Sequence, residues 1–125
     1  MYCNPNANST ACADHSYEAS VSNSPVQIFT NRGNLYGFLV ENNTVADCFI
    51  QLFDAATIGA VTVGTTAPNF TFKVPASGAM GKDATEIPIH FFAKGCVVAV
   101  TTTRTGSTAP ASGATCQFWH YNSKY

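Results

Sequence analysis

The stretch that decides the fold is DCFIQLFDA, residues 47–55. In an extended strand, successive side chains point to opposite faces. Between the two aspartates, one face carries Cys48, Ile50 and Leu52, and the other carries two phenylalanines around a single polar residue, Gln51. We therefore expect a strand that is buried on one face and largely covered on the other.

Alternating or β-branched runs flank this stretch on both sides. In chain order they are SYEASVS, PVQIFT, LYGFLVEN, AVTVG, NFTFKVP, IPIHFFAKG, CVVAVTTT and CQFWHYN. Together they predict about eight or nine short strands, with turns at regular spacing and no helix. ASGAMGKDATE is expected to be a long loop, and Pro88 places its segment at a sheet edge or a bulge. The predicted fold class is all-β, a single antiparallel β-sandwich or barrel.

The N-terminal residues differ in composition from the rest of the chain. Residues 1–16 are mainly Asn, Ser, Ala and Cys, with no apolar period. We expect a flexible N-terminal arm over residues 1–16 and one β-sandwich domain over residues 17–125.

The cysteines divide between these two parts of the chain. Cys3 and Cys12 lie in the arm, where they could form a disulfide with each other or with a neighbouring chain. Cys48, Cys96 and Cys116 lie in apolar strands and are expected to be buried free thiols. No spacing among the five cysteines matches a zinc or haem signature.

Two short stretches echo each other, GTTAPN at residues 64–69 and GSTAPA at residues 106–111. A duplicated unit would repeat its apolar positions as well as its turns, and the flanking residues here share no pattern. The echo is better explained by turn chemistry, in which Gly frees the backbone and Pro fixes φ. We expect two similar corners of one sandwich.

Charge and hydropathy exclude several classes of partner. Charged residues make up 10% of the chain, and the formal net charge is −1. Neither nucleic acid nor an anionic membrane is therefore an expected partner. No apolar run approaches the ~20 residues that span a bilayer. The N-terminus lacks the basic and apolar regions of a signal peptide, so we expect synthesis in a cytoplasm and release by lysis.

The histidines and carboxylates offer little for catalysis. Among His15, His90 and His120, His90 is the best candidate for a ligand or a base, although a half-buried strand histidine is the preferred interpretation. Asp47 and Asp54 would lie about 23 Å apart along a strand, too far for a carboxylate pair. Asp83 and Glu86 are expected to be solvated in a loop. No catalytic motif is present, and we predict a non-enzymatic protein without cofactor or metal.

Four segments of the chain resemble those of a known group of proteins. The segments QLFDA, VTVGTTAP, VPASG and TTTRTGSTAPASGA occur together and in this order. In this the chain resembles small β-rich virion proteins of tailed bacteriophages, including phages of cyanobacteria and other aquatic bacteria. The similarity spans about residues 17–121. The shared segments mark a scaffold, so no catalytic role carries over.

The resemblance implies a decoration, or cement, protein on the outside of the capsid shell. Its expected partners are the major capsid protein and further copies of itself, as a homodimer or homotrimer. The arm would contact the shell, with Tyr2, Asn4, Pro5 and Asn8 as candidate contact residues. In the C-terminal strand, alternate residues are expected in the core, and Trp119, Tyr121 and Tyr125 are candidate interface aromatics.

Two alternatives remain open at this point. One is a tail or fibre module that binds host-surface glycans through exposed aromatics, again Trp119, Tyr121 and Tyr125. The other is a head–tail joining or tail-tube subunit, although such subunits usually carry more charge than this chain.

Overall fold

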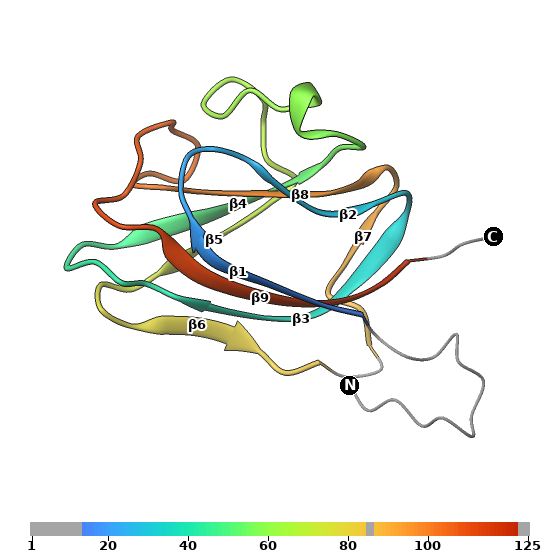
Figure 1. Cartoon of the computed structure of the whole chain (residues 1–125), viewed down its shortest axis with the longest axis horizontal. Coiled ribbons are helices and arrows are strands. Elements are labelled where there is room, and N and C mark those ends of the chain that lie inside the picture. The colour runs from blue at the N-terminus through green and yellow to red at the C-terminus, as the bar shows by residue number, and fades with distance from the viewer. Residues whose placement is uncertain (1–13, 85–86, 123–125) are drawn as a thin grey trace.

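The structure is a computed structural model, and it describes residues 14–84 and 87–122. It consists of two antiparallel sheets that face each other as a sandwich (Figure 1). Sheet A is formed by β1 (Asp14–Val21), β9 (Ala114–Asn122), β3 (Gly33–Glu41), β6 (Ala79–Lys82) and β7 (His90–Phe92). Sheet B is formed by β2 (Val26–Thr30), β8 (Gly95–Thr101), β4 (Cys48–Asp54) and β5 (Phe70–Val74).

The predicted all-β antiparallel fold is confirmed, and it takes the form of a sandwich because the sheets do not close into a barrel. In sheet A, β6 and β7 pair with successive parts of β3. As expected from Pro88, the segment that follows it lies at a sheet edge, because β3 is the only described strand that pairs with β7.

The main core lies between the two sheets. Ile50 of β4 pairs with Val100 of β8 and Phe72 of β5, and these side chains face the opposite sheet. Sheet A contributes alternate residues of β3 and β9, among them Leu35 and Phe118, which are fully buried. Burying a side chain of this size contributes about 1.5–3 kcal/mol to the free energy of unfolding.

The second face of β4 is covered as well, as its sequence predicted. Phe53, Val97 and Ala99 point away from sheet A and pack against the segment that follows β4. This segment lies above sheet B on the side away from sheet A (Figure 1). It contains AVTVG, which was expected to be a strand and is not. Its Val61 and Val63 instead pack onto the outer face of sheet B, after the short 3₁₀ turn η2 (Ile58–Ala60).

The two echoed stretches meet over this same face. Gly64 has φ of +92°, and a Cβ built on it would lie 2.8 Å from Cβ of Ser107. Gly106 accepts a hydrogen bond through its carbonyl oxygen from Nε2 of the buried Gln51, at 3.0 Å. The same Nε2 donates to Oγ1 of Thr101 at 2.6 Å. The echo is therefore not a duplication but two loops that together close one side of sheet B.

Two further expectations need correction. The predicted loop ASGAMGKDATE contains strand β6, because Ala79–Lys82 pairs with the C-terminal half of β3. The last residues of the expected arm, 14–16, belong to β1, since Asp14 is already paired with His120. A bulge between Glu18 and Val21 then turns Val21 into the core while Tyr17 stays on the outer face. An unbroken strand would place Tyr17 and Val21 on one face, but a bulge changes the side to which the next residues point.

The three cysteines of the described residues are buried free thiols, as predicted. Burial, with a smaller effect of the nearby Asp47 charge, raises the pKa of Cys48 from 9.0 to about 11. Burial likewise raises the pKa of Cys116 to about 12 and shifts the pKa of Cys96 upward. The reactive thiolate form is thus disfavoured in all three.

We expect these thiols to resist alkylation in the folded protein. At pH 8, iodoacetamide should leave Cys48, Cys96 and Cys116 unmodified and should label all three once denaturant is added, as measured by peptide mass spectrometry. The unfolded thiols ionise near 9.0 while the folded ones stay protonated. Stability should therefore also fall as pH rises above that value, because the unfolded state then binds fewer protons. Rapid labelling of Cys96 without denaturant would contradict the packing described here.

Candidate functional site

The two outer faces of the sandwich differ. Loops close much of the outer face of sheet B, whereas the outer face of sheet A carries a band of aromatic side chains. Strand register fixes this placement, because directly paired residues project to the same side. The band, which we call the aromatic face, consists of His15 and Tyr17 of β1, Trp119 and Tyr121 of β9, and Phe91 of β7.

Several of these side chains are strongly exposed. Tyr17 is 58% exposed and Phe91 is 54% exposed. Asn34 of β3 pairs with both Tyr121 and Phe91, so the band crosses the whole sheet from β1 to β7. Contiguous exposed apolar surface on a small domain commonly marks an interaction site.

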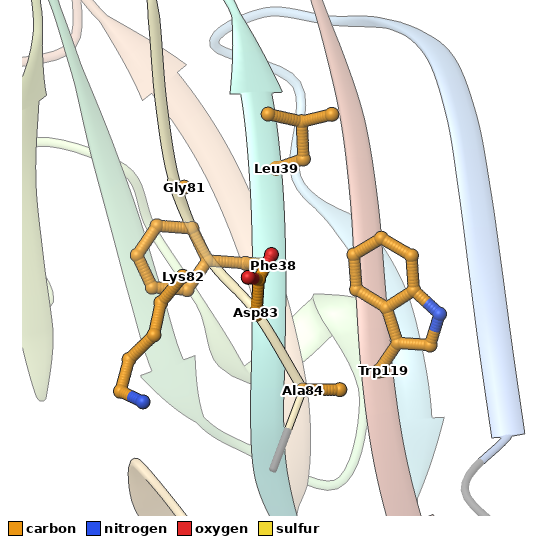
Figure 2. Close-up of a pocket in the computed structure, with 7 residues that line it drawn as sticks. All are labelled: Phe38, Leu39, Gly81, Lys82, Asp83, Ala84 and Trp119. Carbon is orange, nitrogen blue, oxygen red and sulfur yellow. The ribbon is translucent and has the colours of Figure 1, made fainter. Parts of the chain in front are cut away.

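A hollow of about 360 Å³ lies on this face, between β3 and the segment that follows β6 (Figure 2). Trp119 forms one wall, and Asp83 and Ala84 lie opposite it, whereas the side chain of Lys82 points away from Trp119 (Figure 2). Leu39 of β3 lies at one end. The space beside Trp119 therefore combines an aromatic ring, an aliphatic side chain and one carboxylate.

The Trp119 side chain is held from the β1 side. Its ring packs against the imidazole of His15, with centroids 5.0 Å apart and planes tilted by 34°. Nε2 of His15 lies 3.0 Å from Oε1 of Gln117, which is the next outward-facing residue of β9. Since Gln117 pairs with Tyr17, these contacts connect the hollow with the exposed edge of sheet A.

The predicted site residues fall into two groups. Trp119 and Tyr121 share the aromatic face, and the alternate residues of the same strand are buried, as expected. Cys3, Cys12, Tyr125 and the arm residues Tyr2, Asn4, Pro5 and Asn8 lie outside the described residues. The contributions of His15, Phe91 and Asp83 were not predicted. Strand pairing, which the sequence does not display, sets His15 beside Trp119 and places Phe91 on the same face. The segment after β6 places Asp83 at the hollow.

The side chains of His90 and His120 pack against phenylalanine rings. His90 is half-buried against Phe70 and Phe92, with ring centroids 5.6 and 4.7 Å away, which matches the preferred interpretation of a packed strand histidine. His120 is buried, stacks on Phe29 at 4.8 Å, and its Nε2 lies 2.9 Å from Oγ of Ser16.

Asp47 and Asp54, at the two ends of β4, accept hydrogen bonds from backbone amides. Asp54 accepts hydrogen bonds from the amides of Ala93 and Lys94, at 3.0 and 2.7 Å, and so fixes the turn between β7 and β8. Asp47 accepts one from Ala76 and lies 3.8 Å from Nζ of Lys73. Within residues 14–84 and 87–122, no three His, Cys, Asp or Glu side chains gather closely enough to hold a metal ion.

Strand β1 forms one edge of sheet A. It is eight residues long, and among the described strands only β9 pairs with it. Most of its side chains are exposed. An edge of this length presents a row of backbone N–H and C=O groups to which another chain can add a strand.

Comparison of the chain with family models, with curated proteins and with solved structures finds no match in any of the three. The resemblance to phage virion proteins therefore stays a prediction. No helix in the described part of the chain has the length and hydropathy to cross a membrane.

Proposed function

We propose that the protein decorates the head of a tailed bacteriophage, binding the outside of the capsid shell without catalysing a reaction. The sequence resemblance suggests this class. The observation that carries the proposal is the edge strand β1, which pairs with β9 alone among the described strands and follows directly after the N-terminal residues expected to contact the shell.

The edge offers a specific way to bind. A strand of a capsid subunit, or of a second copy of this chain, pairs with the free side of β1 and extends sheet A. β1 carries two charged side chains, Asp14 and Glu18, which oppose such an interface least where they stay hydrated at its polar rim. Tyr17 is exposed at the middle of the strand and supplies apolar contact area to the added chain.

The aspartates favour a structural role over catalysis. Both Asp47 and Asp54 are engaged with backbone amides, and each stabilises a turn of the sandwich. These contacts support a rigid scaffold that presents one edge and one face to partners.

A charge placed on the edge strand tests this mode of binding. We expect the Tyr17→Lys variant to bind heads that lack the protein at least tenfold more weakly than wild type, because a lysine on an edge opposes strand addition. The measurement is co-sedimentation of purified protein with heads of the phage that encodes it.

Val45→Lys is the matched control. Val45 is 93% exposed in the turn between β3 and β4, away from the edge, so its variant should sediment with heads like wild type. Equal binding of wild type and Tyr17→Lys would overturn docking at the edge. A wild-type protein that binds tails and not heads would overturn the decoration function itself.

A further inference from the structure

The hollow beside Trp119 has no part in edge docking, and its chemistry points to a ligand. We propose that it binds one residue of a saccharide, with Trp119 as an apolar wall and the carboxylate of Asp83 as acceptor for sugar hydroxyl groups. This inference stands apart from the decoration function, because it uses β3, β9 and the segment after β6 and leaves the edge of β1 free.

The shape of the hollow depends on Gly37 of β3. A Cβ on Gly37 would lie 2.7 Å from the backbone nitrogen of Ala84 and 2.9 Å from the carbonyl oxygen of Lys82. Only a residue without a side chain therefore lets the segment after β6 descend onto β3. That close approach sets the wall carrying Asp83 opposite Trp119 (Figure 2).

A bulge in β3 contributes to the same arrangement. Leu35 pairs with His120 and Gly37 with Trp119, so Tyr36 is an extra residue in the strand. The bulge brings Gly37, rather than Tyr36, into register with the tryptophan. On its β3 side, the indole ring is therefore next to the backbone of the segment after β6 and not next to a side chain of β3.

The aromatic wall is fixed before any ligand arrives. His15 packs on the Trp119 ring, and the 3.0 Å contact between His15 and Gln117 holds the imidazole in place. A ring held in this way loses little conformational entropy when a ligand binds, which favours affinity.

The side chains match a sugar better than other small ligands. A pyranose ring presents C–H groups that pack against an aromatic ring, and hydroxyl groups that donate to a carboxylate. A phosphate ligand would call for a basic cluster, whereas here the single lysine is next to an aspartate.

The size of the hollow also suits a single sugar ring. Ligand pockets in proteins begin at roughly 300 Å³ and extend to several times that volume. The hollow, at about 360 Å³, falls at the small end of this range. It therefore has room for one residue of a saccharide, with the rest of a longer chain outside it.

The chain contains one tryptophan, so its fluorescence reports on the hollow directly. The test is a titration of the purified protein with glucose, galactose, mannose and N-acetylglucosamine, each as the monosaccharide and as a short oligosaccharide. We expect a saturable change in Trp119 fluorescence with at least one of these sugars. Asp83→Ala should weaken that binding at least tenfold.

Asp14→Ala is the matched control, since Asp14 is an exposed aspartate of the same sheet that does not line the hollow, and it should bind the sugar like wild type. Asp83→Ala should also still sediment with heads, which separates this proposal from edge docking. The absence of a saturable response to every sugar tested, or equal binding by wild type and Asp83→Ala, would overturn the saccharide site.

Discussion

Replacing Phe53 by alanine is expected to lower the free energy of unfolding by about 3–5 kcal/mol, the cost of a large-to-small change in a packed core. Phe53 lies on the outer face of sheet B, where a simple sandwich would expose it, yet it is 1% exposed. The segment with Val61 and Val63 covers it. Chemical denaturation followed by circular dichroism measures the effect.

Phe91→Ala is the control on the other sheet. The Phe91 side chain is 54% exposed on the aromatic face. Its removal should therefore change the free energy of unfolding by less than about 1 kcal/mol. Similar losses for the two variants would mean that the outer faces are equally covered, contrary to the difference on which the candidate site rests.

Gly95→Ala is expected to lower the free energy of unfolding by about 3–5 kcal/mol as well, since backbone strain and steric overlap each cost roughly 1–3 kcal/mol. Gly95 opens β8 with φ of +148°, which side chains rarely adopt. An added Cβ would lie 2.6 Å from the carbonyl oxygen of Ala55 and 2.8 Å from that of Phe29. These are backbone atoms of the strands on either side, so they cannot rotate away.

Gly59→Ala provides the comparison for this variant. A Cβ at Gly59 would meet only Oγ1 of Thr57, at 3.9 Å. The thermal midpoint should therefore stay within a few degrees of wild type. A Gly95→Ala protein as stable as Gly59→Ala would show that the meeting point of β2, β4 and β8 is looser than described.

The strands were largely predictable because their pattern is local. In DCFIQLFDA the alternation and the near absence of polar residues predicted burial on both faces, and the structure agrees. AVTVG has the same β-branched character but became a loop, because its valines cover an apolar sheet face that no strand covers. Propensity alone does not distinguish these two uses of valine.

The candidate site was only partly predictable. Trp119 and Tyr121 stood out as aromatics on one face of a strand. Their neighbours His15 and Phe91 come from strands distant in sequence, and pairing across the sheet decides which residues meet. The bulges near Val21 and Gly37 further change which side chains face outward, and no local pattern marks them.

The most direct test of the proposed function is a cryo-EM reconstruction of the virion of the phage that encodes this chain. We expect density for the sandwich on the outer surface of the head, with β1 paired to a strand of a capsid subunit or of a second copy. The hollow beside Trp119 should remain open to solvent. Heads without this density would contradict the proposed function. Sandwiches that contact the shell through the loops over sheet B, while β1 stays unpaired, would contradict docking at the edge.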